Sequence, residues 1–253
     1  REIADITAWV KAGAVWPNAP AAPLTTSARA VRSMEPNAAS IRPHLQAWYR
    51  ADTLPLADGK PVHVWPDSSG NGRDLSATQG VRPGGVGQPG TFVAASTLYR
   101  RPAVRFDPET GLASSPDSPP DIHGNAALTL FLVLNLRPTD VPHPHDGILG
   151  IGNPANSTGD PGKPLAALVM ITRHPEPELK LAGGWNHDAT LGKSSFASYW
   201  NRPILLTVVR EPGPMRTTTR FFLDGVPSEA SPLGRKVEGT DGIPDIRHRD
   251  DIG

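Results

Sequence analysis

The sequence predicts an all-β fold in which two antiparallel sheets pack face to face as a sandwich. The first observation is the stretch 128–137, LTLFLVLNLR, in which leucine recurs at every second position. This spacing is typical of one face of a strand and not of a helix. The second observation is the number of chain-breaking residues, 29 prolines and 25 glycines among 253 residues, which favours dense turns over long helices. Because one face of 128–137 is apolar and the other mixed, we expect a central strand with a second layer against it.

Composition excludes several classes of function. The chain has 25 basic and 25 acidic side chains, and this balance gives neither the basic footprint of a nucleic-acid-binding protein nor a polybasic membrane patch. It has no cysteine, so disulfides, thiolate metal sites and a CxxCH haem attachment are excluded within these residues. No apolar run approaches the roughly 20 residues needed to cross a bilayer, and we expect no membrane span.

The first seventeen residues predict a short amphipathic helix followed by a linker. Gly13 suits the end of such a helix and Pro17 stops it. The segment 18–40 is rich in Ala, Pro, Ser and Thr and has no periodicity, so we expect an extended linker. The apolar stripe of the predicted helix consists of Ile3, Ile6, Trp9 and Val10.

Shorter alternating runs predict the remaining strands. In the run 103–107 the alternation places Val104 and Phe106 inward. The runs 204–210 and 217–223 are expected to form an antiparallel pair joined by the turn residues 211–214. After Pro227 the pattern fades. The other expected strands are 45–49, 62–66, 148–152, 165–172 and 178–181.

Three motifs together resemble a known domain family. They are AWYRAD at 47–52 with DGKPVHVWPDSSGNGRDL at 58–75, RPAVRFD at 101–107, and FFLDG at 221–225. The pattern is similar to LamG-like (laminin G, concanavalin A-like) jelly-roll domains over residues 41–253, and it implies a jelly roll with an Asp-Gly hairpin. Such domains close with further strands after this hairpin, which the sequence does not show before Gly253, so we expect the domain to be incomplete at its C-terminal end.

A second resemblance concerns the N-terminal segment 1–17. Trp9, Val10, Gly13, Ala14, Trp16 and Pro17 form the pattern WVxxGAxWP. This pattern resembles the end of the last helix of a c-type cytochrome domain in multidomain, planctomycete-type proteins. The resemblance implies an exported, periplasmic or extracellular protein with neighbouring domains in the same polypeptide, and haem only in the preceding domain. The alternative is a local helix that docks on the sandwich.

One polar turn suggests a metal site. Asp67, Ser69, Asn71 and Asp74 bring together the oxygen ligands that Ca²⁺ prefers, although the order and the twelfth-position Glu of an EF-hand are missing. The alternative is that Asp67 and Ser69 bond the amides of their own turn. We favour the second interpretation.

Aromatic and polar residues in loops suggest a ligand-binding site. Sugar-binding sandwiches place an exposed aromatic ring against the sugar beside amide and carboxylate partners. Each tryptophan could equally close the rim of the core. His143 and His145 are separated by Pro144, and we expect solvated histidines there in preference to a metal pair. The candidate ligand-binding residues are Trp185, Asn186, His187, Asp188 and Trp200.

No catalytic motif stands out. The Glu-x-Asp-x-x-Glu strand of related glucanases, a Gly-x-Ser-x-Gly motif and a phosphate loop are all missing. We therefore expect no catalytic residues and a non-catalytic module that binds a polysaccharide or a protein. A structural spacer without a ligand and a divergent glycoside hydrolase are the alternatives. The hydrolase requires two carboxylates about 5–10 Å apart in a groove.

Overall fold

The computed structural model describes residues 41–77, 88–98, 100–107, 110–115, 117–137, 145–152, 167–172, 178–182, 188–191 and 199–227, with Ile243 and Ile246. These residues form mostly antiparallel strands with a few short helical turns. The predicted all-β sandwich is confirmed at this level. The predicted helix at 1–17 and the linker at 18–40 lie outside the described residues.

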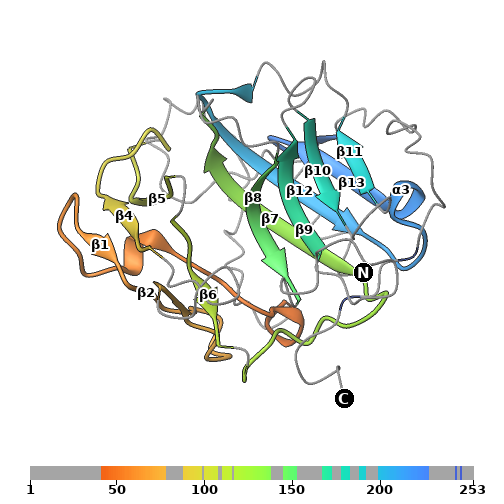
Figure 1. The fold of residues 1–253 in the computed structure, drawn as a ribbon, viewed down its shortest axis with the longest axis horizontal. Helices are drawn as coiled ribbons and strands as arrows, with labels where there is room; N and C mark the ends of the chain where they lie inside the picture. The colour runs from red at the N-terminus through yellow and green to blue at the C-terminus, as the bar shows by residue number, and fades with distance from the viewer. Residues whose placement is uncertain are drawn as a thin grey trace, which may run out of the picture.

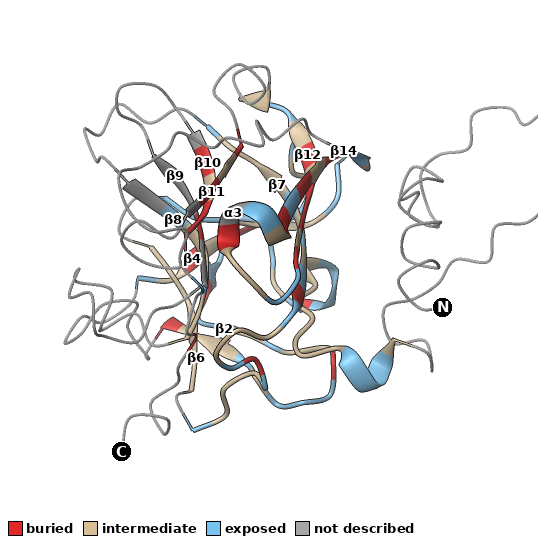
Figure 2. Ribbon diagram, turned by 90° about the vertical axis from the view of Figure 1, so that its right-hand side faces the viewer, coloured by how far each residue is buried: buried red, intermediate tan, exposed pale blue. Residues whose placement is uncertain are grey.

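Two four-stranded antiparallel sheets make up the sandwich, with strand orders β14-β13-β12-β7 and β11-β10-β9-β8. Figure 2 shows them facing each other, with the helical turn α3 between them at one end. The first sheet contains β7 (Leu128–Asn135), β12 (Pro203–Arg210), β13 (Thr219–Leu223) and β14 (Val226–Pro227). The second contains β8 (His145–Ile151), β9 (Ala167–Thr172), β10 (Glu178–Ala182) and β11 (Asp188–Leu191).

The leucine-rich strand β7 lies where its alternation predicts but, among the described strands, at the edge of its sheet. Its pairing with β12 runs in continuous antiparallel register from Leu128↔Arg210 to Asn135↔Pro203. Among the described strands β12 is central, because it pairs with β7 on one side and β13 on the other. The prediction of a central strand is therefore corrected. The alternation fixed the inward face of β7 but carried no information on its neighbours.

The main core lies between the two sheets. Leu128, Leu130, Leu132 and Leu134 point into it from β7. Burial of apolar area from both sheets is the main stabilising contribution, worth about 1.5–3 kcal/mol for each fully buried aliphatic side chain. The most deeply buried members include Val169, Leu179, Leu181, Leu191, Ile204, Leu206, Val208 and Met215.

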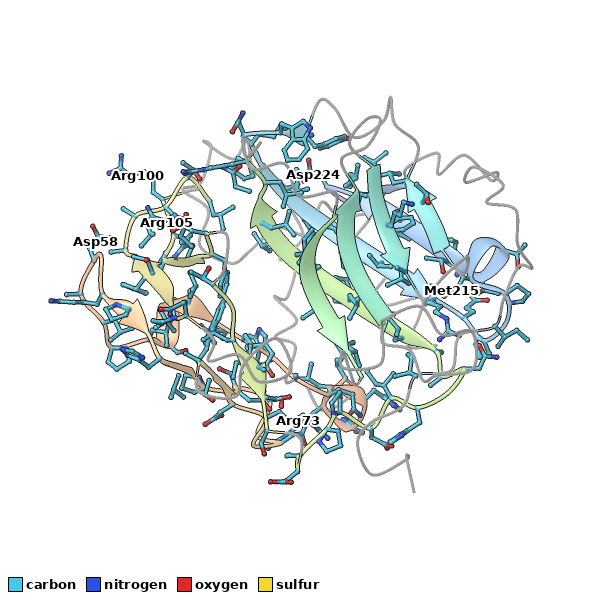
Figure 3. The ribbon with its side chains drawn as sticks, in the orientation of Figure 1. Asp58, Arg73, Arg100, Arg105, Met215 and Asp224 are labelled. Atoms are coloured by element: carbon cyan, nitrogen blue, oxygen red, sulfur yellow. The ribbon has the colours of Figure 1, made fainter. Side chains whose placement is uncertain are left out.

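The hairpin from β13 to β14 forms as predicted. Asp224 and Gly225 are its two turn residues, with φ of 52° and 77°, and Leu223 pairs with Val226. Two consecutive residues with positive φ are the signature of a type I′ turn, whose twist matches that of the strands. Asp224 also accepts a hydrogen bond from the Leu205 amide at 2.9 Å. Figure 3 shows Asp224 at the upper end of the sandwich.

The connection from β12 to β13 differs from the prediction. Residues 217 and 218 belong to the helical turn α3 (Met215–Thr218) and not to the strand. Met215 is 1% exposed and joins the core, so this turn closes one end of the sandwich. Strand β8 begins at His145, three residues before the predicted start, with a bulge between Gly147 and Leu149.

A buried cation lies at the same end as α3. Arg210 is 1% exposed, and one of its terminal nitrogens donates to the Ala126 carbonyl at 2.5 Å while the other donates to the Asn125 side chain. Burial lowers the pKa of Arg210. Asn125 also accepts from the Gly213 amide at 2.9 Å, so this pair fastens the segment before β7 to the end of β12.

A smaller layer lies beside the sandwich (Figure 1). It contains two three-stranded sheets, of order β1-β4-β5 and β2-β3-β6, around a small cluster in which Leu54, Val62 and Phe92 are buried. Its strands are β1 (Pro61–Val62), β2 (Val64–Trp65), β3 (Leu75–Ser76), β4 (Gly90–Val93), β5 (Ala103–Arg105) and β6 (Ala113–Ser114). Two 3₁₀ turns accompany them, η1 (Arg42–His44) and η2 (Ala51–Thr53).

Three strand predictions in this layer are corrected. The run 62–66 is interrupted at His63 and splits into β1 and β2, which belong to different sheets. The run 45–49 is not a strand: Tyr49 makes only an isolated bridge to Asp67. Strand β5 ends at Arg105, and Phe106 is 46% exposed and not inward. The alternation that predicts an inward Phe106 holds only while the backbone stays extended and paired.

Candidate functional site

The polar turn predicted as a candidate calcium site is a closed hydrogen-bond network around Asp67. One carboxylate oxygen accepts from the amides of Trp48 and Ser69, both at 2.9 Å. The other accepts from the Ser69 hydroxyl at 2.7 Å and the Arg73 amide at 3.2 Å. A carboxylate offers about four acceptor positions, so the turn and the Trp48 amide together use all of them.

This network sets the ionisation of two side chains. Burial favours the neutral form of Asp67, but the hydrogen bonds from Ser69, Trp48 and Arg73 outweigh it and lower the pKa of the carboxyl. Burial, with the charge of Asp67 as the next contribution, raises the pKa of Tyr49. The Tyr49 hydroxyl donates to the Arg73 carbonyl at 2.6 Å. The turn therefore holds an anionic carboxylate next to a neutral phenol.

The other candidate calcium ligands are also engaged. Asp74 accepts from the Asp67 amide at 2.8 Å, and the Asn71 amide group donates to the carbonyls of Leu45 and Gln46 at 2.7 and 3.1 Å. Within the described ranges, no three His, Cys, Asp or Glu side chains gather where they could hold a metal ion. The geometry favours the interpretation in which the turn bonds its own amides, and calcium binding stays a prediction.

The same turn connects the small layer to the loop that leads into β7. The Arg73 side chain donates to the Gln46 carbonyl at 2.6 Å and to the Pro119 carbonyl at 3.0 Å. The Gln46 side chain in turn accepts from the Asp121 amide at 2.8 Å. Figure 3 shows Arg73 at the lower edge, between the two parts. The turn therefore has a structural role, because its hydrogen bonds hold together segments that are distant in the sequence.

An aromatic cluster, defined here as Trp48, Arg50, Asp52, Trp65 and Phe106, lies on the surface of the small layer. Trp65 and Phe106 stack with their centroids 6.5 Å apart and their planes at 23°. Trp65 is half-buried against the small core, whereas Phe106 is 46% exposed. The Phe106 ring is therefore exposed to solvent and is supported from below by Trp65.

Gly90 on β4 explains how Phe106 reaches this position. A Cβ atom at Gly90 would lie 2.7 Å from the Val104 side chain and 3.0 Å from the Phe106 ring. Contacts that short do not occur without displacement, so only glycine lets β4 approach β5 and Phe106 so closely. The exposed ring is thus backed by Gly90 and by Trp65.

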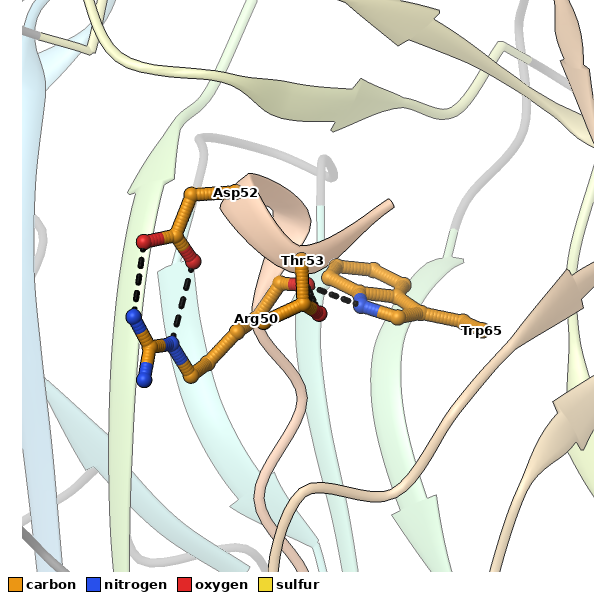
Figure 4. A network of polar contacts seen from close by, with 4 residues as sticks. All are labelled: Arg50, Asp52, Thr53 and Trp65. Carbon is orange, nitrogen blue, oxygen red and sulfur yellow. Dashed lines mark hydrogen bonds and ion pairs between the residues drawn. The ribbon is translucent and has the colours of Figure 1, made fainter. Parts of the chain in front are cut away.

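Arg50 joins the two halves of the cluster (Figure 4). Its guanidinium forms a two-point pair with Asp52, at 3.0 and 2.8 Å, and lies 4.9 Å from the centre of the Trp48 ring. Its carbonyl accepts from the Trp65 indole at 3.0 Å and from Thr53 at 2.8 Å. Hydrogen bonds from Arg50 lower the pKa of Asp52, so a fixed ion pair lies beside the aromatic rings.

This combination has the chemical groups that recognise an uncharged polar ligand. Aromatic faces contact the apolar C–H surface of a sugar, and a planar guanidinium–carboxylate pair supplies donors and acceptors next to them. Reasoning from the sequence missed Phe106 and Arg50 as surface groups. The signal was present in the AWYRAD and RPAVRFD motifs, which contain four of the five residues of the cluster.

The ligand-binding residues predicted from the sequence are only partly visible. Trp185, Asn186 and His187 lie outside the described residues. Asp188 opens β11, where only its backbone is described. Trp200 is half-buried and packs against the main core, as expected for a residue that closes the rim. This set stays a prediction.

The neighbours of Trp200 form a second polar group at the upper end of the sandwich. The Arg202 guanidinium lies 4.2 Å from the centre of the Tyr199 ring and 3.4 Å from an Asp224 oxygen. Both charged side chains are more than one-third exposed, so this ion pair contributes little stability.

Comparison with known proteins yields no family assignment: no family model, no curated protein and no solved structure matches this chain. No helix in the described part of the chain is long and apolar enough to cross a membrane. The resemblances to LamG-like and cytochrome domains therefore stay predictions.

Proposed function

We propose that this chain is a non-catalytic β-sandwich module that binds a glycan through the aromatic cluster. The observation that carries the proposal is the exposed Phe106 ring, stacked on Trp65 and backed by Gly90. Gly90 is buried and the Trp65 indole is hydrogen-bonded, so the Phe106 ring needs little reorganisation on binding. The proposed ligand is a polysaccharide, and a protein ligand is the alternative.

The finer features of the proposal rest on the resemblance. They are a LamG-like jelly-roll topology, export from the cytoplasm, and a place within a longer polypeptide that carries other domains. The two-sheet sandwich and the Asp224-Gly225 hairpin are compatible with that topology. The carboxylates near the cluster are already paired, Asp52 with Arg50 and Asp107 with Arg105, which supports binding in preference to hydrolysis.

The experiment is titration calorimetry of the 253-residue chain against a panel of soluble neutral polysaccharides. We expect binding to at least one of them and a loss of about tenfold, or about 1.4 kcal/mol, in Phe106→Ala. Val226→Ala is the matched control, because Val226 is also an exposed apolar residue, at 64%, but lies on the distant hairpin. Affinity for no polysaccharide, or an equal loss in both variants, would overturn the glycan proposal.

A structural spacer is the second candidate function. The observation that favours it is the Asp67 turn. All four acceptor positions of the Asp67 carboxylate receive hydrogen bonds from groups of the protein itself, so this carboxylate offers none to a ligand. If the panel shows no binding and Phe106→Ala changes nothing except local packing, the spacer function is the one that remains.

A further inference from the structure

Two polar side chains are buried as neighbours at the end of the main core, and each has a polar atom without a hydrogen-bond partner. Arg210 is 1% exposed and Thr219 is 7% exposed. They are cross-strand partners on β12 and β13, so their side chains share the inward face of the sheet. The two unpartnered atoms are Arg210 Nε and the Thr219 hydroxyl. Buried polar groups are almost always paired, so two such atoms at adjoining positions need an explanation.

The surroundings of this pair are apolar. On the inward face Arg210 lies opposite Leu128 of β7, and Val208 and Phe221 are the next inward residues along β12 and β13. All three of these apolar residues are buried. The turn α3 lies between the two sheets at this end and next to β11 (Figure 2). The pair is therefore enclosed by protein on the side of the core.

The charge of Arg210 is not neutralised by any acidic side chain in the described part of the chain. Its terminal nitrogens donate to Ala126 and Asn125, which are both neutral acceptors. Glu211 is next in sequence but pairs with Arg220 on the surface. Burial lowers the pKa of Arg210, yet a guanidinium stays protonated in proteins. A buried charge that cannot be lost is stable only with a compensating charge.

We propose that Arg210 and Thr219 bind one small monovalent anion, of the kind of chloride, at this end of the sandwich. Arg210 Nε and the Thr219 hydroxyl supply two donors, and the guanidinium supplies the opposite charge. A water molecule could accept the same two hydrogen bonds, but it would leave the charge uncompensated. Phosphate and sulfate carry more charge and more acceptor oxygens than one cation and two donors satisfy. The anion links β12 to β13, so its expected effect is to stabilise the fold, independently of glycan binding at the aromatic cluster.

The stability of the 253-residue chain as a function of chloride concentration tests the proposal. Urea denaturation is measured while chloride replaces methanesulfonate at constant sodium concentration, so that the ionic strength stays fixed. An anion that binds only the folded chain stabilises it by mass action, and we expect the folded-to-unfolded ratio to rise at least about threefold between about 5 and about 500 mM chloride. Thr219→Val keeps the shape of the side chain without the hydroxyl and should remove most of this rise. Thr219→Ser keeps the hydroxyl and should retain it.

Thr207→Val is the matched control. Thr207 is also buried with an unpartnered hydroxyl, but its cross-strand neighbours are Phe131 and Phe222 and not a cation. This variant should respond to chloride as the native chain does. No chloride effect in the native chain, or an equal effect in Thr219→Val and Thr207→Val, would overturn the proposal.

A direct measurement covers the case in which Thr219→Val does not fold. Bromide has the charge of chloride and nearly its size, and bromine scatters X-rays anomalously. Crystals of the native chain grown in sodium bromide should show an anomalous peak within hydrogen-bond distance of Arg210 Nε and the Thr219 hydroxyl. A water molecule at this position, or a carboxylate of the chain paired with Arg210, would overturn the proposal.

Discussion

At the scale of single residues, Asp67 shows how one side chain shapes a loop that has no regular secondary structure. The segment 66–74 is too rich in polar residues to be held by apolar packing, so its backbone amides need partners. Asp67 accepts from three amides and one hydroxyl. An ionised carboxylate is the one side chain that accepts four hydrogen bonds without donating any.

Asp67→Asn tests this role. An amide group keeps one acceptor oxygen and turns its NH₂ toward donors, so two of the four contacts are lost. We expect the free energy of unfolding to fall by about 1–3 kcal/mol, measured by urea denaturation at pH 7. Asp121→Asn is the control, because the Asp121 side chain is 83% exposed and its loss should cost no more than about 0.5 kcal/mol.

The pH dependence of the same pair of proteins provides an independent check. The hydrogen bonds lower the pKa of Asp67 below its ordinary value of 3.8. A lowered pKa means that the stabilisation is present above pH 3.8 and is lost as the pH falls through the lower, folded-state pKa. The difference between the native chain and Asp67→Asn should therefore shrink in acid. A difference that stays constant down to the acid transition would show that the charge of Asp67 plays no part.

At the scale of elements, the β13–β14 hairpin is held by backbone conformation. Gly225 has φ of 77°, a region in which a Cβ atom is strained. We expect Gly225→Ala to reduce the free energy of unfolding by about 1–2 kcal/mol, measured by thermal denaturation. Gly150→Ala is the control, since Gly150 is exposed on β8 and its φ is not positive. A loss of equal size in both variants would show that strand propensity, and not the turn, is responsible.

The elements also show what the sequence could predict. Alternation identified the buried face of β7 and the β12–β13 pair, because side-chain direction in a strand is a local property. It placed β7 in the middle of the sheet and Phe106 inward, and both predictions were wrong. Which strand lies beside β7 is decided by contacts distant in sequence, and the exposure of Phe106 depends on where β5 ends and on Gly90. The same reasoning found Asp67 but not the Arg50–Asp52 pair, although both residues lie in the AWYRAD motif, because two charges at that spacing meet only when the local backbone turns, here at η2.

At the scale of the whole molecule, the two hydrophobic cores differ in size, and we expect the part built on the smaller core to be less stable. Among the described residues, the cluster of the small layer contains three buried apolar residues, whereas the main core contains fourteen. Three such residues contribute about 5–9 kcal/mol, which does not offset the conformational entropy of ordering the surrounding chain. We therefore expect the small layer, which Arg73 and Gln46 tie to the segment that leads into β7, to depend on the sandwich more than the sandwich depends on it.

This asymmetry predicts different effects for two cavity-forming variants. Phe92→Ala in the small layer should cost about 3–5 kcal/mol of local stability, so its strands would open without the rest. Amide hydrogen exchange should then accelerate in β1, β4 and β5 while β9, β10 and β12 stay protected. Leu206→Ala in the main core should instead accelerate exchange in both parts, because the small layer loses its support. Equal acceleration throughout in Phe92→Ala would mean that the two cores unfold as one unit, and the dependence would then be mutual.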